Sequence, residues 1–441
     1  MSRRRAPLAL LLAAPALAQD PAPADRADLA QSTPPPLGWL SDPERPPAAP
    51  LDALAGGKIS LDNRFRVELA DTSFADSASA VTNRLRLGYA AKPWRGVSAA
   101  VEIENVIALN EGDYFVPPVP EGDPRRTVIA DPKGTVLNQL YARFATESLG
   151  DSGVALDLRA GRQRIEYDDE RFIGDVGWRQ FDQTFDALSA QTDLGDDRLV
   201  LRYAYLWGVE RVFGPDGPSP DSDSHLVNLR FAAAPELVVT PFAYLLDFRG
   251  DEPLNSSNTF GVRLAGTLGA DARDGSSDAP DVSLAYELTY ARQSDAGDNP
   301  IKFDADFFAA QLTLARRDLG SLSAGCQILG SDDGAYGFRF PLGTNHAFQG
   351  FADNFLVTPA DGLQDVYAGA SAELAWGVQG SVVAHWFWSD EGSRFLGQEL
   401  DLALAKKINE NWSVLLKTAL FDGDAGEPDV TRFWVQTEFR F

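Results

Sequence analysis

The chain of 441 residues has one cysteine, three histidines and only seven lysines. The lone Cys326 excludes an intramolecular disulfide and a metal site built from several cysteines. Beyond residue 18, no hydrophobic run approaches the roughly 18 to 20 residues of a membrane-spanning helix. A helical membrane protein is therefore excluded. Disorder over most of the chain is disfavoured, because 26 Phe, 11 Tyr and 9 Trp offer ample surface to bury.

Acidic residues outnumber basic ones by 64 to 39, which gives a formal net charge of −25. This balance argues against nucleic acid as a partner. Taking seven lysines from the 39 bases leaves 32 arginines. The guanidinium group is rigid and weakly hydrated, so the bias indicates fixed, hydrogen-bonded cations. Genomic base composition would produce the same bias.

The N-terminus has the form of a secretory signal peptide over residues 1–18. Arg3 to Arg5 are basic, Ala6 to Ala14 are apolar, and Ala16-Leu17-Ala18 is a small-x-small cleavage site. Residues 19–57 form a Pro/Ala-rich periplasmic linker, which we expect to be extended or unstructured; a tether to the cell wall or to a partner is the alternative. Residues 58–441 form the remaining domain.

From Lys58 onward, apolar and polar residues alternate with a period of two. In the last segment, Phe433, Val435 and Phe439 share one face. Such alternation predicts strands with one apolar and one polar face, and lengths of about 10 to 13 residues suit tilted strands that cross a bilayer. Eighteen segments follow this pattern: 58–69, 81–91, 96–107, 135–147, 153–165, 182–192, 197–207, 223–233, 236–247, 257–269, 281–293, 303–317, 320–330, 363–375, 378–388, 396–407, 411–421 and 431–441.

The links between these segments alternate in length. The even links are mostly tight turns, with 270–280 as the exception. The odd links are long: 70–80, 108–134, 166–181, 208–222, 331–362 and 422–430. Long extracellular loops and short periplasmic turns are typical of outer-membrane barrels. We therefore predict an all-β, transmembrane antiparallel barrel of about 18 strands, in the outer membrane of a Gram-negative bacterium.

A barrel of about 16 to 18 strands encloses an aqueous channel unless loops fill it. Successive residues of a strand point to opposite faces, and we call this alternation parity. Parity places twelve basic residues on the polar inner face: Arg64, Arg66, Arg84, Arg86, Arg143, Arg159, Arg202, Arg230, Arg263, Lys417, Arg432 and Arg440. It places these acids beside them: Asp62, Glu68, Asp157, Glu287, Glu399, Asp401 and Glu438. The bases either form a path that attracts anions or pair with the acids and brace the wall.

Two stretches of the chain resemble the alginate-export family of outer-membrane porins. The first carries Gly161, Arg162, Gln163, Tyr167, Arg171, Gly174, Trp178, Arg179, Phe185 and Asp186. The second carries Pro341, Leu342, Gly343, Thr344, His346, Phe348, Gly350 and Asp353. The resemblance implies an 18-stranded monomeric barrel, and the family prototype passes an anionic uronate polysaccharide through an arginine-lined pore.

The prototype also has a long second extracellular loop and a long eighth periplasmic turn that occludes the pore. Here the second loop, 108–134, is present, but the eighth turn spans only Ile408 to Glu410. Gating by that turn therefore does not carry over, and alginate as the specific solute is less firmly implied.

The two long links that carry the motifs are expected at the extracellular mouth. The carboxylates of Glu166–Phe181 either bind a divalent cation or lipopolysaccharide counter-ions, or belong to a solvated acidic loop. Residues 331–362 are expected to bend into the lumen as a constriction, with His346 as a hydrogen-bonded structural residue rather than a metal ligand.

An enzyme is the rival class. The three histidines are His225, His346 and His385, and Ser381 lies four strand residues from His385, about 13 Å away and too far for a hydrogen bond. No nucleophile elbow, phosphate-binding loop or zinc-protease motif is present. The sequence therefore predicts no enzyme and no cofactor.

These observations predict a channel for passive diffusion of anionic solutes, acidic (uronate) saccharides among them. A general small-nutrient porin is the alternative, and a barrel-embedded hydrolase is the less favoured one. The expected partners are outer-membrane lipid and lipopolysaccharide, the solute itself, and the barrel-assembly machinery, which would recognise the C-terminal strand ending at Phe441. A monomer is expected, without nucleic acid.

Overall fold

A computed structural model describes residues 47–150, 154–194, 198–250, 252–269 and 282–441. Eighteen long strands form one antiparallel sheet across these ranges: β1 (Lys58–Thr72), β2 (Ala75–Ala90), β3 (Val97–Ala108), β6 (Gly134–Thr146), β7 (Ala155–Gln163), β8 (Thr184–Asp193), β9 (Leu199–Glu210), β10 (Asp221–Ala234), β11 (Leu237–Leu246), β13 (Ser257–Leu268), β14 (Val282–Asp295), β15 (Asp304–Arg316), β16 (Gly320–Leu329), β19 (Leu363–Leu374), β20 (Val378–Trp388), β21 (Phe395–Lys407), β22 (Trp412–Gly423) and β23 (Val430–Arg440). All eighteen predicted segments are strands.

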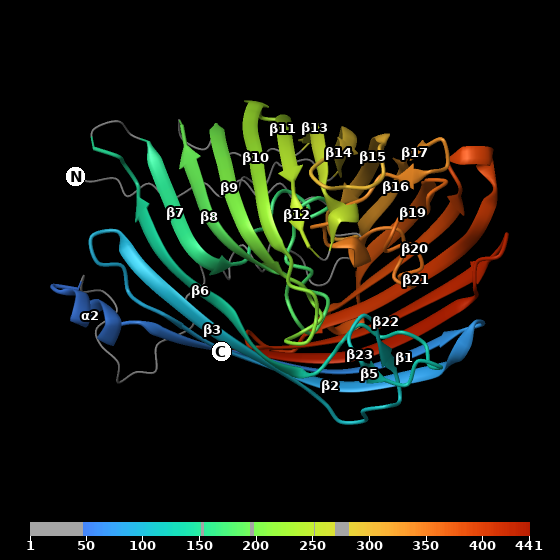
Figure 1. Ribbon diagram of the computed structural model, residues 1–441, viewed down its shortest axis with the longest axis horizontal. Helices are drawn as coiled ribbons and strands as arrows, with labels where there is room; N and C mark the ends of the chain where they lie inside the picture. The colour runs from blue at the N-terminus through green and yellow to red at the C-terminus, as the bar shows by residue number, and fades with distance from the viewer. Residues whose placement is uncertain (1–46, 151–153, 195–197, 251, 270–281) are drawn as a thin grey trace.

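The sheet closes on itself. β1 pairs with β2 on one side and with β23 on the other, from Asp62 opposite Arg440 to Thr72 opposite Val430. Figure 1 shows the resulting ring of strands. Closure leaves no edge strand, so the backbone groups of the wall are paired within the sheet, as a lipid environment requires. The predicted fold class, an 18-stranded antiparallel barrel, is confirmed.

The two faces of the wall differ as the alternation predicts. Large apolar side chains on the outer face are exposed, such as Phe260 (57%), Leu312 (55%) and Leu322 (62%). The inner face carries the buried polar and charged side chains, for example Thr289 and Thr313. Such an apolar exterior suits the hydrocarbon of a membrane rather than water.

The predicted long link 70–80 is wrong. β1 continues to Thr72 and β2 begins at Ala75, so only Ser73 and Phe74 connect the two strands. The outer face of this segment lacks large apolar residues, so the alternation that predicts a membrane strand is missing from its sequence. Its inward alanines are instead buried against the following loop: Ala70, Ala78 and Ala80 pack with Tyr114, Val116, Val119 and Ile129.

Three long links pack inside the ring: 109–133, 164–183 and 330–362 (Figure 1). They contain the short hairpins β4 (Phe115–Val116) with β5 (Glu121–Gly122), and β17 (Ser331–Asp332) with β18 (Tyr336–Gly337), and the 3-10 turn η2 (Asn345–Ala347). Phe172 joins the second link to the third and to the wall, because its ring lies 4.7 Å from that of Phe242 and 5.0 Å from that of Phe340.

The remaining elements are small: α2 (Pro50–Ala55), β12 (Phe248–Arg249), η1 (Pro253–Asn255), η3 (Ala375–Gly377) and η4 (Glu391–Ser393). No helix among the described residues is long and apolar enough to cross a membrane. The predicted signal peptide 1–18, residues 19–46 of the predicted linker and the link 270–280 lie outside the described residues. The rest of the linker contains α2.

The outer face of β14 provides a test of the membrane orientation. Leu288 is 41% exposed there, and we expect Leu288→Arg to destabilise the barrel by about 2–4 kcal/mol in vesicles, because it places a guanidinium in hydrocarbon. Ala285→Arg is the matched control, since Ala285 shares the inner face of β14 with Glu287. Equilibrium unfolding in denaturant measures both variants. Equal losses would contradict the assignment of the faces.

Candidate functional site

The strand register places all twelve predicted bases on one face, the inner one. Arg64 lies opposite Arg84 and Glu438, Arg143 opposite Arg159, and the pairing continues around the ring to Arg432 on β23. Their position follows from the register alone. Their role in a solute path stays a prediction.

The twelve divide into two groups by burial. Six are covered, with at most 8% of the residue exposed: Arg64, Arg66, Arg84, Arg86, Lys417 and Arg432. Six remain partly accessible: Arg143, Arg159, Arg202, Arg230, Arg263 and Arg440. The covered positions favour the bracing interpretation for the first group, whereas the side chains of the second group stay partly accessible.

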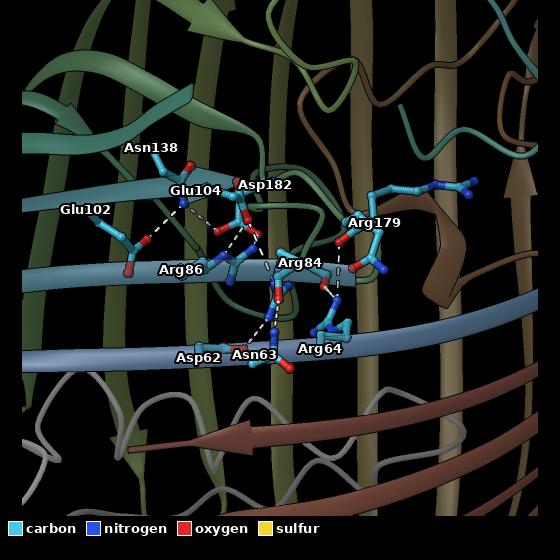
Figure 2. A network of polar contacts seen from close by, with 12 residues as sticks. Asp62, Asn63, Arg64, Arg84, Arg86, Glu102, Glu104, Asn138, Arg179 and Asp182 are labelled. Carbon is cyan, nitrogen blue, oxygen red and sulfur yellow. Dashed lines mark hydrogen bonds and ion pairs between the residues drawn. The ribbon is translucent and has the colours of Figure 1, made fainter. Parts of the chain in front are cut away.

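The covered arginines of β1 and β2 belong to a network of ion pairs (Figure 2). Arg84 donates to Asp62 at 2.8 Å and to Glu438 at 2.9 Å. Arg86 donates to Glu104 at 2.5 Å and pairs with Asp182 from the 164–183 loop. Arg84 and Arg86 therefore each meet carboxylates from two segments, which offsets the cost of burying their charge.

The same arginines hold the irregular backbone of the 164–183 loop. The guanidinium of Arg64 donates to three consecutive carbonyls, of Gly177 at 2.9 Å, Trp178 at 3.3 Å and Arg179 at 3.2 Å. Arg66 donates to the carbonyl of Trp178 at 2.6 Å and pairs with Asp131 of the 109–133 loop at 3.2 Å. Buried carbonyls without a strand partner need such donors.

The two stretches that carry the family resemblance lie against each other inside the barrel. Gly174 donates its N–H to the carbonyl of Leu342 at 2.9 Å, and Thr344 donates its N–H to the carbonyl of Glu170 at 3.0 Å. Gly343 packs so tightly that a Cβ would lie 2.2 Å from the carbonyl oxygen of Arg171. These contacts make the two loops one packed unit.

Arg171 is the central cation of this unit. Its guanidinium lies 3.6 Å from the ring centre of Phe340 and 4.5 Å from that of Phe348, and it donates to Gln349 at 2.7 Å. Burial lowers the pKa of Arg171 to about 9. Cation–π contacts and an amide therefore take the place of a paired carboxylate.

A second set of contacts joins both loops to the wall. Trp178 stacks on His346 with ring centres 4.5 Å apart, and Arg179 pairs with Asp353 at 2.7 Å. His346 bonds through Nδ1 to Asp353 at 2.7 Å and through Nε2 to the ammonium of Lys417 at 2.8 Å. The Lys417 donor fixes the proton of a neutral imidazole on Nδ1. Among the described residues no cluster could hold a metal ion.

Other motif residues lie at the long-link ends of β7 and β8. Arg162 pairs with Asp186 at 2.8 Å on the outer face, whereas Gln163 and the buried Phe185 face inward. Gly161 has a φ of +124°, and a Cβ there would lie 2.3 Å from the carbonyl oxygen of Leu140. The remaining motif residues contact the loops or the wall: Tyr167 lies beside Tyr244, the carbonyl of Pro341 accepts from Arg211, and Gly350 lies against Glu399.

The accessible arginines follow the inner wall from β6 to β13. Arg143 and Arg159 share one carboxylate, Asp157, at 2.7 and 3.3 Å. Arg202 donates to the neutral side chains Gln191 and Asn228, with Asp168 3.7 Å away. Further along, Arg263 pairs with Glu287, and on the other side of the ring Arg440 pairs with Glu438. One carboxylate between two guanidinium groups leaves an excess of positive charge on β6 and β7.

Several residues of the network were not predicted from the sequence. Asp131 lies in a loop, where no periodicity indicates a direction. Asp182 is the first residue of the predicted strand 182–192, but β8 begins only at Thr184, so Asp182 lies in the loop before it. Glu102 and Glu104 alternate on β3 and face inward, so parity could have found them.

The protein resembles known outer-membrane channels. Residues 59–204 match the model of the family described as alginate export. The resemblance to the alginate-export family is confirmed over these residues. The second motif stretch lies beyond the matched range. No curated protein matches the chain.

Solved porin structures share the fold. OccAB4 of Acinetobacter baumannii has a TM-score of 0.66 at 13% identity, covering 87% of this chain and 98% of that one. OpdL of Pseudomonas aeruginosa has a TM-score of 0.63 at 15% identity, covering 88% and 99%. OpdK of the same organism, solved with vanillate, has a TM-score of 0.61 at 14% identity, covering 87% and 98%. Identities this low show the fold alone.

The buried His346 predicts a pH dependence of stability. Burial lowers its pKa to about 3, whereas an unfolded histidine titrates near 6.5. The unfolded chain therefore takes up the proton first, and the free energy of unfolding falls as the pH drops from about 6.5 to 3. His346 contributes up to about 1.4 kcal/mol per pH unit to this fall. Asp353, whose pKa is held below its usual range by His346 and Arg179, adds a further loss below about pH 4.

Unfolding of the detergent-solubilised barrel, measured between pH 7 and 3, checks this expectation. His346→Asn should flatten the decline, because the histidine that must be buried neutral is gone. His225→Asn is the control, since His225 lies on the outer face beside Tyr203. An unchanged decline in His346→Asn would contradict the prediction.

Proposed function

We propose that this barrel is an outer-membrane porin through which small anionic solutes diffuse passively. The observation that carries the proposal is the accessible basic wall of β6 to β10. There Arg143 and Arg159 share the single carboxylate of Asp157, and Arg202 donates to neutral amides with the carboxylate of Asp168 3.7 Å away. Fixed positive charge along a lumen lowers the energy of anions there and raises their local concentration.

The solute class follows from the side chains along this wall. Guanidinium groups bind carboxylates through paired hydrogen bonds, and aromatic rings lie beside two of them, since Arg159 lies 5.7 Å from the ring of Tyr141 and Arg202 5.8 Å from that of Tyr167. Such a surface suits organic acids and acidic saccharides, uronates included. OpdK, a barrel of the same fold, was solved with vanillate, which is an aromatic carboxylate.

The surroundings of the channel are part of the proposal. We place the barrel in the outer membrane of a Gram-negative bacterium as a monomer, in contact with lipid and lipopolysaccharide and inserted by the barrel-assembly machinery through its C-terminal strand. Residues 1–18 act as a signal peptide and residues 19–57 as a periplasmic linker. The matched family and the neighbouring structures are channels, and none supports a hydrolase.

The reversal potential in a planar bilayer under a salt gradient tests the function. The native protein should be anion-selective. Replacing Arg143, Arg159, Arg202 and Arg230 together by Gln should shift the reversal potential toward cation selectivity, because the wall then loses its excess charge. The matched control replaces Arg249 and Arg292, two exposed arginines on the outer face of the wall, by Gln and should leave it unchanged.

The outcomes separate the two candidate channels. Block of the current by an oligouronate or by vanillate, lost in the quadruple variant, supports passage of organic anions. A native channel without anion preference would replace the proposal with a general small-nutrient porin. Equal selectivity of the native and the quadruple variant would show that these arginines brace the wall.

A further inference from the structure

The outer wall of the barrel contains a groove that has no part in the proposed pore and is not lined by the long loops that the structure describes. It has a volume of about 600 Å³ and lies across β14 to β21, at the end of the strands where the short links connect them. Its lining is mostly apolar and includes Leu314, Leu322, Leu374 and Leu404. The volume falls within the range of small-molecule sites, about 300–1,000 Å³.

The groove exists because the strand register aligns small residues. Arg316 pairs with Gly320, and Ala372 pairs with Gly380, so the floor consists of Gly, Ala and Gly on three adjacent strands. Leucines from neighbouring positions form its sides: a Cβ on Gly380 would lie 2.8 Å from a methyl carbon of Leu374 and 3.4 Å from one of Leu404.

The smooth floor continues along the wall toward mid-height. In the next rows, Ala370 lies opposite Leu322, and Ala368 lies between Ala324 and Ala384. A straight apolar chain that starts at the short-link end would therefore run along alanines toward the middle of the membrane. Acyl chains of the membrane leaflet have this direction and chemistry.

The mouth of the groove carries a cation, whose charge is complementary to that of a lipid phosphate. Arg316 is the last residue of β15, faces outward and is exposed. Among the described residues its guanidinium has no ion-pair or hydrogen-bond partner, and only its backbone is bonded, for example through its carbonyl to the N–H of Leu319. Short links of such barrels are periplasmic, so Arg316 lies at the level of the phosphates of the periplasmic leaflet. Guanidinium binds phosphate through charge-assisted hydrogen bonds.

We propose that this groove binds one phospholipid of the periplasmic leaflet, with its phosphate on Arg316 and an acyl chain along Gly320, Ala372 and Gly380. The inference rests on the membrane location given under Proposed function, but not on the selectivity of the pore.

Native mass spectrometry of the full barrel, released from detergent after incubation with phosphatidylglycerol, tests the site. The native protein should retain one lipid at detergent concentrations that strip the others. Arg316→Gln and Ala372→Leu should each lower retention about tenfold, by removing the phosphate partner and by filling the groove. Arg198→Gln, an exposed arginine at another short link, and Ala99→Leu, an outward alanine of β3, are the matched controls.

The conductance of every variant should equal that of the native channel, which keeps this test independent of the proposed function. Lipid retention that falls equally in variants and controls would overturn the proposal. The lipid would then belong to the general annulus around the barrel and not to this groove. Selective retention of lipid A in place of phosphatidylglycerol would also overturn it. Disulfide-linked dimers of an Ala372→Cys variant, formed in phosphatidylglycerol vesicles, would assign the groove to a second copy of the chain and overturn it as well.

Discussion

The pairing of β1 with β23 is the constraint on which the rest of the structure depends. A sheet in lipid cannot leave an edge open, because each unpaired N–H or C=O group costs several kcal/mol there. Eighteen strands must therefore close into a ring, and the ring of that size has a lumen wider than its own side chains can fill. The lumen is narrowed by loops that enter it from one end. These loops are the three long links 109–133, 164–183 and 330–362.

Loops that lie inside a barrel bring backbone carbonyls with no strand partner, and this explains the use of arginine. One guanidinium has five donors in a planar fork, enough for Arg64 to serve three loop carbonyls and Glu438 together. Lysine could not do this with a single nitrogen. Lys417, the lysine of the covered group, contacts aromatic rings and an imidazole. Removing a covered arginine would leave both carboxylates and carbonyls unsatisfied in the interior.

Strand positions were predictable because lipid on one side and water or loops on the other impose a period of two. That rule failed at 70–80, where Ala70 and Ala78 face a loop and the outer face carries no apolar residues. Parity also gave the face of each arginine, but not what covers it. The cover depends on contacts such as that between Arg64 and Gly177, more than one hundred residues apart, which no local pattern encodes. The same holds for the two motif stretches: their residues were evident, but the contact of Gly174 with Leu342 was not.

The three packed links are unevenly distributed along the lumen, and this determines which of its arginines stay accessible. The loops enter from the long-link end and cover the arginines at mid-height on β1 and β2. Arg143, Arg202 and Arg230 remain accessible within four residues of the short-link ends of their strands. Charge at one mouth of a pore raises the counter-ion concentration on that side only. If the barrel passes anions as proposed, an anion in the periplasm meets the basic wall before the narrow part, whereas one arriving from outside must pass the packed loops first. The proposed function therefore implies anion currents of different size under voltages of opposite sign.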